Sequence, residues 1–404
     1  MKLTNVVLRQ HIGWHFSKNW IAQGKRRPIE TGAEALLKKK GVKVVDSKEF
    51  LIPKRQPLEQ VNVVGYGYKK QPLDNTHPDW QERVLFTYKD NNVLLEGLSQ
   101  AKIITKTVEV EEGLPDNNTE VPKDVHKQVK NIILNSWLLD AEQEKLPKIK
   151  DPNRPAFNFP RIYGVSQNRR NKLLIGKLLQ LIESKSDESI LKDRYLFNDL
   201  FFSFPFEKNG DLIQFKLKGD SLLTSRKPLA AVTQQQTDSL ELPDIYPIKE
   251  TITLNEENIY KVEDLYPISS KVSKHHPHTL FIHYNDQDVA NLFEEEVTES
   301  QVFGRSLMKT FTVAASYARQ EFGKDVKNLP QPVVLQCVHT NSQWFHFGVL
   351  QLNSLDVNSS QKNIWYQTEK IPLFDKCKYE AGKPELEGYN REVIKNLIRF
   401  YNNV

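Results

Sequence analysis

The chain has 404 residues, with 56 Lys/Arg, 51 Asp/Glu and a net charge of +5. This length allows two or three domains with a well-buried core. No window approaches the roughly 18 consecutive apolar residues of a membrane-spanning helix, so we expect no such helix. The two cysteines, Cys337 and Cys377, match no metal-ligand spacing and exclude a disulfide framework.

The positive charge is concentrated near the N-terminus. Residues 1–75 contain 15 Lys/Arg against 6 Asp/Glu, whereas residues 76–404 contain 41 Lys/Arg against 45 Asp/Glu. A basic arm before a slightly acidic body is typical of a targeting segment, of a nucleic-acid-binding segment, or of both.

Residues 1–29 have the character of a mitochondrial presequence. They contain no acidic residue, and their basic residues are spread among apolar ones. The alternative is a basic arm that remains on the mature protein.

Residues 30–82 are predicted to form an extended basic arm, because prolines separate its clusters of cations. Tyr66 and Tyr68 alternate with glycines beside Lys69 and Lys70, which combines aromatic faces for base stacking with charge for phosphates. The alternative is a solvated loop whose tyrosines pack on the body. The RNA-binding candidates in this arm are Lys38, Lys39, Lys40, Lys54, Arg55, Tyr66, Tyr68, Lys69 and Lys70.

Residues 83–250 are predicted to form an N-terminal half of mixed helices and strands. Periodicity predicts a strand at 83–88, helices at 92–106 and 124–145, and a further helix from 169 to 182. A hairpin at 196–217 is predicted around an Asn-Gly turn.

A second basic segment covers residues 145–177, where 9 Lys/Arg face only Asp151, with Phe157, Phe159 and Tyr163 nearby. Cations at a helix start oppose the helix dipole, so their position favours an anionic partner over helix stability. The RNA-binding candidates here are Arg161, Arg169, Arg170 and Lys172.

Residues 251–404 are predicted to form a C-terminal half, and its boundary with the N-terminal half falls within a Gln-rich connector at about 224–274. A helix is predicted at 298–322, where Thr298 and Gln301 have the spacing of a capping box and Gly323 follows the last turn.

Two strands at 333–339 and 344–352 are apolar on both faces, which predicts a hairpin in the centre of a sheet. We expect Trp344 to be buried in that hairpin. A third strand at 363–374 and a helix at 389–401 follow. The predicted fold class is therefore α+β, with helices packed on largely antiparallel sheets and an extended basic N-terminal arm.

Two constellations resemble catalytic or metal chemistry. His275, His276, His278 and His283 form the one histidine cluster, but they lack a regular ligand spacing, so packed or solvent-facing histidines are the expected alternative. Cys337 and His339 fall on one face of a strand, yet their apolar neighbours predict a buried, inert thiol. We therefore expect no catalytic residues, no metal and no cofactor.

Several short motifs in register resemble one known family from about residue 83 to the C-terminus. They are Leu-Leu-Glu-Gly-Leu-Ser-Gln-Ala at 94–101, Thr-Lys-Thr at 105–107, Glu-Gly-Leu-Pro at 112–115, Pro-His-Thr-Leu at 277–280, Gln-Pro-Val-Val at 331–334, Phe-His-Phe at 345–347 and Gln-Leu-Asn at 351–353. The family is large-subunit protein thirty-seven of the animal mitochondrial ribosome. Residues 1–82 and the Gln-rich connector do not match visibly.

The resemblance implies a structural constituent of the mitochondrial large ribosomal subunit, located in the mitochondrial matrix and without catalytic residues. It also implies mitochondrial ribosomal RNA and other large-subunit proteins as partners, including a paralogous one historically counted as small-subunit protein thirty. The alternatives are a free mitochondrial RNA-binding or RNA-processing factor and, from the histidine cluster, a metalloenzyme. The family assigns no RNA-contacting side chain, so those candidates rest on charge alone.

Overall fold

The computed structural model of the protein describes residues 31–45, 83–110, 113–114, 121–148, 150–151, 153–232, 241–257, 262–269 and 274–403. The chain divides into two units, Met1–Lys70 and Gln71–Val404. The first unit contains the short helix α2 (Ala33–Lys39), which has no buried side chain. None of the described helices is long and apolar enough to cross a bilayer.

The second unit is built around one large sheet, to which ten of the described strands belong. Its main path runs β2-β13-β12-β11-β10-β8-β1-β9, while β14 pairs with β12 and β7 pairs with β8. The strands are β1 (Leu85–Lys89), β2 (Thr107–Glu109), β7 (Arg194–Lys208), β8 (Asp211–Ser225), β9 (Asn255–Glu257), β10 (His276–His283), β11 (Asn328–Thr340), β12 (Trp344–Ser354), β13 (Asn363–Gln367) and β14 (Ile371–Pro372). Strands from both sides of the predicted division at residue 250 therefore join the same sheet.

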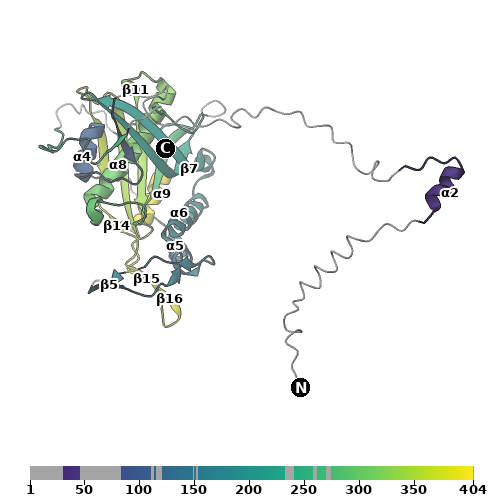
Figure 1. The fold of residues 1–404 in the computed structure, drawn as a ribbon. Coiled ribbons are helices and arrows are strands. Elements are labelled where there is room, and N and C mark those ends of the chain that lie inside the picture. Colours follow the sequence, from purple (N-terminus) through teal and green to yellow (C-terminus); the bar gives the residue numbers. More distant parts are fainter. Residues whose placement is uncertain are drawn as a thin grey trace. The chain divides into compact units, whose positions relative to one another are not determined.

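Helices cover both faces of this sheet (Figure 1). One hydrophobic cluster joins one face to α4 and α8, and a second cluster joins the other face to α5, α6 and α9. The helices of the body are α4 (Gly97–Thr105), α5 (Lys123–Leu134), α6 (Gln167–Glu183), α7 (Glu188–Leu191), α8 (Glu299–Phe322) and α9 (Glu392–Asn402), with a π-helical turn at Asn135–Leu139 and a 3-10 turn at Leu292–Glu294. The fold is α+β, as predicted.

The hairpin β11–β12 occupies the centre of the sheet, as its two apolar faces predicted. Cys337 and Leu335 pack in the cluster under α8, whereas Val334 and Val338 pack in the cluster on the opposite face. Successive side chains of a strand point to opposite faces, so both faces of this hairpin are buried. Trp344, however, lies at the end of β12 and is only partly buried, so the prediction of its burial was wrong. The fully buried tryptophan of this region is Trp365 in β13.

Helix α8 begins with the predicted capping box. The Thr298 hydroxyl accepts a hydrogen bond from the Gln301 backbone N–H, and the Gln301 side chain accepts one from the Thr298 N–H. Gly323 ends the helix at φ 106°, a backbone conformation that glycine adopts readily. Glycine also allows α4 to approach α8, because a Cβ on Gly97 would lie 2.5 Å from the Ser300 carbonyl carbon.

Three strand pairs are parallel, which the prediction of largely antiparallel sheets did not include: β1 with β8, β10 with β11, and β13 with β2. For β10 and β11 the reason is the long crossover through α8, which returns the chain to the same edge in the same direction. The other six pairs of the large sheet are antiparallel.

Some predicted elements have different ends. The helix predicted at 92–106 begins only at Gly97, and the strand predicted at 363–374 is divided between β13 and β14. The helix predicted at 124–145 stops at Leu139, because Glu144 and Lys145 pair as strand β3 with Tyr163 and Gly164. Tertiary pairing here overrides local helix propensity.

Candidate nucleic-acid interface

The second basic segment folds into two small sheets outside the large one. Strand β3 (Glu144–Lys145) pairs with β6 (Tyr163–Gly164), and β4 (Lys150–Asp151) pairs with β5 (Arg154–Asn158). Strand β5 and the hairpin of β15 (Lys376–Glu380) and β16 (Lys383–Glu387) both lie at the lower end of the body in Figure 1. Residues 144–164 are therefore shaped by short strand pairs, whereas the rest of the segment belongs to α6, whose Leu174 and Ile175 are part of the core.

Four large apolar side chains are exposed within residues 157–163. Phe157 is 46% exposed, Phe159 43%, Ile162 60% and Tyr163 68%. The two phenylalanine rings meet edge to face with their centroids 6.1 Å apart. These exposed rings lie on or next to short strands whose backbones are hydrogen-bonded to neighbouring strands. They form a platform on which unpaired nucleic-acid bases can stack.

Cations surround these rings. Lys145, Lys148 and Arg161 are exposed, and within the described part of the chain no carboxylate lies in salt-bridge distance of them. Arg154 bonds to the Asp151 carboxylate at 3.2 Å and lies 5.2 Å from the Phe157 ring centroid. We call the exposed side chains Lys145, Lys148, Arg154, Phe157, Phe159, Arg161, Ile162 and Tyr163 the aromatic–basic surface.

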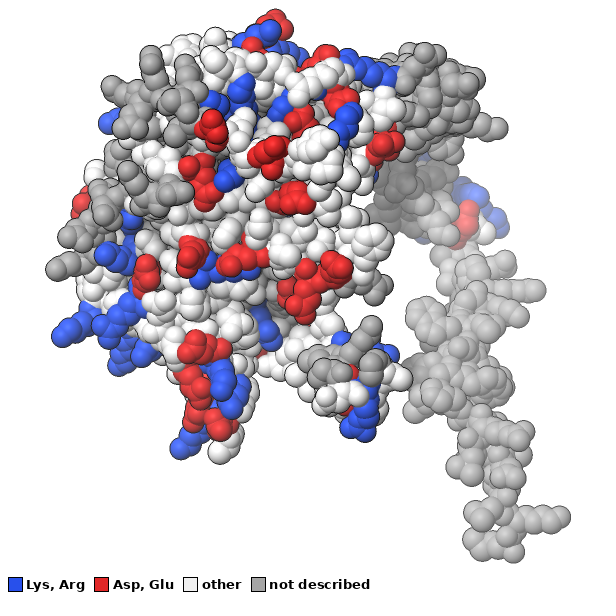
Figure 2. All heavy atoms as spheres, turned by 90° about the vertical axis from the view of Figure 1, so that its left-hand side faces the viewer, with Lys and Arg blue, Asp and Glu red and all other residues white. Residues whose placement is uncertain are grey.

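Charges of both signs are intermixed over the face of the body that Figure 2 shows. A broad single-sign patch is the usual electrostatic footprint of a protein wrapped in nucleic acid. The aromatic–basic surface combines unpaired cations with exposed rings. It is therefore the best candidate for a local nucleic-acid contact.

Two of the predicted RNA-binding arginines, Arg169 and Arg170, are engaged within the protein. Arg169 forms ion pairs with Asp140 and Glu142, and the Asp140 hydrogen bond raises the pKa of the guanidinium. Arg170 lies over the Trp137 ring at 4.4 Å, where burial lowers its pKa. Both side chains therefore hold α6 against the turn that ends at Leu139, and any RNA contact by them stays a prediction.

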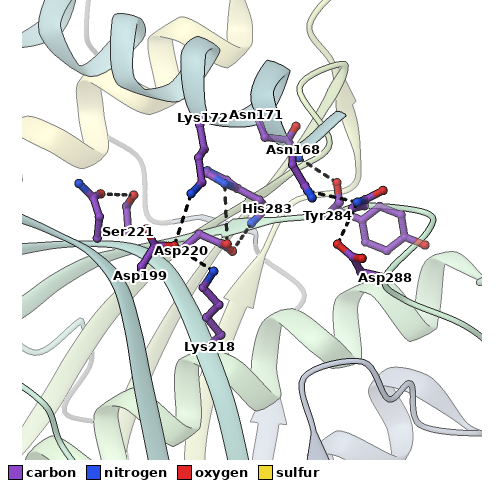
Figure 3. Close-up of polar contacts among 12 residues, drawn as sticks. Asn168, Asn171, Lys172, Asp199, Lys218, Asp220, Ser221, His283, Tyr284 and Asp288 are labelled. Atoms are coloured by element: carbon purple, nitrogen blue, oxygen red, sulfur yellow. Dashed lines mark hydrogen bonds and ion pairs between the residues drawn. The ribbon is translucent and has the colours of Figure 1, made fainter. Parts of the chain in front are cut away.

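Lys172 is exposed and lies 3.5 Å from the Asp199 carboxylate, which also pairs with Lys218 (Figure 3). Lys38 and Lys39 of α2 and the following Lys40 are exposed, and Lys38 pairs with Glu34 at 2.8 Å. The remaining arm candidates, and the predicted presequence, lie outside the described residues: Lys54, Arg55, Tyr66, Tyr68, Lys69 and Lys70.

The structure does not bring the four clustered histidines to one point. His276 bonds to the Tyr317 hydroxyl at 2.6 Å, whereas His278 bonds to the Asn403 carbonyl at 2.9 Å. His283 lies beside Asp220, and His275 packs edge to face on Tyr195. The ring nitrogens have separate protein partners or surroundings, so this geometry contradicts a shared metal site.

The Cys337–His339 pair does not form a nucleophile and base. Burial raises the pKa of the Cys337 thiol to about 12, while the His339 Nδ1 bonds to the Ser306 hydroxyl at 2.8 Å. The same hydroxyl lies 3.0 Å from the Nδ1 of His346, and burial lowers the pKa of both histidines. These are buried polar groups that tie α8 to the central hairpin.

Sequence reasoning did not single out Lys145, Lys148, Arg154 and Ile162, which the structure exposes beside the aromatic rings. The available signal was the charge of the whole 145–177 segment. It did not reveal which of its cations are neutralised by Asp140 and Glu142, because those carboxylates were assigned to a preceding helix.

Comparison with known proteins gives the decisive observation about ancestry. Residues 274–404 match the family model described as mitochondrial 28S ribosomal protein S30 (PDCD9). Large ribosomal subunit protein mL37 of Rattus norvegicus is 28% identical over 73% of this chain and 67% of its own length. The mL37 proteins of Bos taurus and Gallus gallus are 27% and 28% identical, over 75% and 83% of this chain and 70% and 77% of their own lengths. The chain is similar to mL37 proteins of the mitochondrial large ribosomal subunit.

The family-model match covers the C-terminal part of the structural core described above. The family-model match begins at the start of β10 and includes α8, the central hairpin β11–β12 and the closing helix α9. The resemblance predicted from short motifs is thus confirmed for the family. The matching elements are those that bury apolar side chains. The match therefore does not identify the surface residues that contact partners.

Proposed function

We propose that the chain is a structural constituent of the mitochondrial large ribosomal subunit and supports mitochondrial translation in the matrix. The observation that carries this proposal is the similarity to mL37 proteins over about three quarters of the chain. The acid-free, basic residues 1–29 support mitochondrial import independently, because such composition is typical of a presequence.

In this role the aromatic–basic surface contacts ribosomal RNA. Its unpaired cations neutralise phosphates, and Phe157, Phe159 and Tyr163 stack on unpaired bases. The cations of the N-terminal arm, including Lys38, Lys39 and Lys40, add contacts of the same kind. Arg169 and Arg170 contribute by holding the segment in place, since their charges are already engaged.

The body of the chain packs on neighbouring ribosomal proteins. Residues 76–404 carry slightly more Asp/Glu than Lys/Arg, which suits a protein-rich neighbourhood better than burial in RNA. One neighbour is a paralogous mitochondrial ribosomal protein. This part of the proposal is supported by the matching family model, whose description is that of a different ribosomal protein.

The chain performs this role as a scaffold and not as an enzyme. The proposal is supported by the two constellations that resembled active sites: the Cys337 thiol is fully buried with a raised pKa, and the histidines near His276 point to separate partners.

Sedimentation of the tagged chain from a mitochondrial lysate, at moderate and at high salt, tests the proposal. A constituent held by protein contacts remains with the large subunit at both salt concentrations. A free RNA-binding or RNA-processing factor sediments alone or is released steeply as salt rises, because its binding depends on counterion release.

A further inference from the structure

The turn before α8 exposes an apolar side chain almost completely. Phe293 is 92% exposed, the highest value for a large apolar residue in the described part of the chain, and the adjacent Leu292 is 44% exposed. Leu95, in the turn before α4, is 37% exposed. The Gln301 side-chain nitrogen donates to the Leu95 carbonyl at 3.5 Å and to Asn291 Oδ1 at 3.2 Å. The exposed apolar residues therefore come from two segments that meet where α4 and α8 lie side by side (Figure 1).

Hydrogen bonds hold Phe293 at the tip of this turn. Asn291 Oδ1 accepts from the Leu292 N–H at 2.8 Å, and Asn291 Nδ2 donates to the Glu296 carbonyl at 3.3 Å. The Glu295 N–H donates to the Leu292 carbonyl at 3.2 Å, which closes the turn. Phe293 itself has φ 58°, a left-handed conformation that residues with a Cβ rarely adopt. The local backbone thus directs the ring into solvent and away from the core.

The segment that contains the turn is acidic. Residues 284–302 include six Asp/Glu and no Lys/Arg. Those whose side chains the structure shows to be exposed are Asp286, Asp288, Glu295, Glu296 and Glu299. One cation from another segment, Lys370, interacts with the charges of Glu299 and Asp286 and lies 5.0 Å from the Trp344 ring centroid. A single lysine leaves the segment with a net negative charge.

The charge around Phe293 limits what can cover the ring. Carboxylates repel phosphates, so this surface is unsuited to nucleic acid. A second copy of the chain, related by a two-fold axis, would place the same carboxylates opposite one another, and such like-charge pairs are unfavourable. A protein with a basic surface is the partner that complements both the ring and its acidic surroundings.

We propose that Phe293 is the anchor of a docking site for another protein, which supplies an apolar pocket rimmed by Lys or Arg. Buried aromatic anchors carry a large share of the affinity of protein interfaces, and rim charges set their specificity. The site, called the Phe293 surface, consists of Leu95, Leu292, Phe293, Glu295, Glu296 and Glu299. The inference rests on the proposed function, because it identifies a surface through which the body packs on a neighbouring ribosomal protein.

The Phe293 surface and the aromatic–basic surface differ in the charges beside their exposed rings. Lys145, Lys148 and Arg161 accompany the rings of the aromatic–basic surface, whereas Glu295 and Glu296 accompany Phe293. An exposed ring alone fits either a base or a protein pocket. The neighbouring charges decide between them, so the first surface faces RNA and the second faces protein.

Photocrosslinking from position 293 tests the identity of the partner. The full chain is expressed with p-benzoylphenylalanine at this position, large subunits are purified and irradiated, and crosslinked peptides are mapped. The expected crosslink joins position 293 to a different ribosomal protein, at an apolar peptide flanked by Lys or Arg. Crosslinks to ribosomal RNA, to a second copy of this chain or to an acidic peptide would overturn the inference, as would no crosslink in particles that contain the chain.

Failure of this inference is distinguishable from failure of the proposed function. A chain that sediments outside the large subunit contradicts the ribosomal role. The same crosslinking is then performed on the fraction that contains the chain. A crosslink to a basic, apolar peptide of another protein supports the docking site there, and the absence of one overturns it.

Phe293→Gly separates docking from folding. Glycine adopts a positive φ readily, so the melting temperature of the purified chain is expected to be maintained or raised. Incorporation into large subunits, in competition with co-expressed unmodified chain, is expected to fall about fivefold or more because the anchor is lost. Phe201→Ala removes a 62% exposed ring of β7 outside the Phe293 surface and is expected to incorporate normally. Normal incorporation of Phe293→Gly, or a lowered melting temperature with unchanged incorporation, would overturn the inference.

Charge reversal tests the basic rim of the partner. Glu295→Lys with Glu296→Lys is expected to reduce incorporation about fivefold or more in the same competition, because like charges then face each other across the interface. Asp187→Lys with Glu188→Lys is the matched control, since these residues are also adjacent, acidic and exposed but lie at α7. Equal losses in both pairs, or incorporation that is unchanged by Glu295→Lys with Glu296→Lys, would overturn the assignment of a basic partner.

Discussion

In the core around the ten-stranded sheet, Trp365 and Lys309 are buried and Lys309 has a carboxylate partner, whereas the aromatic–basic surface exposes rings and cations. Trp365 is 0% exposed in the sheet, but Tyr163 is 68% exposed. Lys309 is 2% exposed and pairs with Asp90 at 2.7 Å, but Lys148 is exposed. The same residue types therefore stabilise the fold in one region and remain available for a partner in the other.

The largest effect on stability is expected from removing the largest buried ring, that of Trp365. Trp365→Ala is expected to lower the free energy of unfolding by about 3–5 kcal/mol, because it leaves a cavity in the core beside Gly348. Trp344→Ala, at the partly exposed end of β12, is expected to cost clearly less. Denaturant unfolding of both variants checks the order, and equal losses would contradict the assignment of Trp365 to the core.

The second test removes the Asp90 carboxylate, which forms ion pairs with the buried Lys309 and Arg305. Asp90→Asn leaves Lys309 and Arg305, which are 2% and 3% exposed, without their counter-charge. Breaking such a pair costs about 3–5 kcal/mol, and we expect a loss near the lower end because Asp90 itself is 32% exposed.

The Asp90 ion pairs also predict a pH dependence. Burial alone would raise the pKa of Asp90, but Lys309 and Arg305 outweigh it and lower the pKa to about 2. The unfolded-state value is about 3.9, so this contribution to stability is present above about pH 4 and is lost as pH falls toward 2. The loss should be smaller in Asp90→Asn than in the unmodified chain, and identical acid profiles would show that Asp90 is not the group responsible.

The third test concerns the exposed rings. Phe157→Ala with Tyr163→Ala is expected to weaken binding of single-stranded RNA by about 1–3 kcal/mol for each base that stacks. The free energy of unfolding should change by no more than about 0.5 kcal/mol, because both side chains are exposed. Phe201→Ala is the matched control, since Phe201 is 62% exposed in β7 and lies outside this surface. A similar loss of RNA affinity in the control would contradict a specific role for the aromatic–basic surface.

The smallest expected effect is that of a single exposed cation. Lys148→Gln should reduce the slope of log affinity against log salt by about 0.7, which is the value for one phosphate contact on a single strand. Lys376→Gln provides the comparison, because Lys376 is 65% exposed but lies 3.8 Å from the Glu387 carboxylate. An unchanged slope for Lys148→Gln would remove this lysine from the interface.

The central part of the fold could be predicted because its signals are local. The Thr298–Gln301 capping box defines the start of α8, and apolar residues on both faces of 333–339 indicate a central strand. The parallel pairing of β10 with β11 could not be read in the same way, because it depends on how α8 crosses the sheet. Buried Lys309 and Arg305 also lack a local signal, since their partner Asp90 is more than two hundred residues away.

The candidate interface was predicted only as a charged segment. Charge counting included Arg169 and Arg170, although Asp140, Glu142 and Trp137 engage them about thirty residues upstream. Trp344 was wrongly expected to be buried, because it is an aromatic residue in an apolar run, but it lies at the strand end and is only partly buried. In both cases the deciding partners come from tertiary structure.

The most direct test of the proposed role is ultraviolet crosslinking of RNA to protein in purified mitochondrial large subunits, followed by peptide mapping. The account predicts that crosslinked peptides of this chain map to residues 144–164, around Phe157, Phe159 and Tyr163. Crosslinks confined to the helices and strands of the large sheet, with none in residues 144–164, would contradict it.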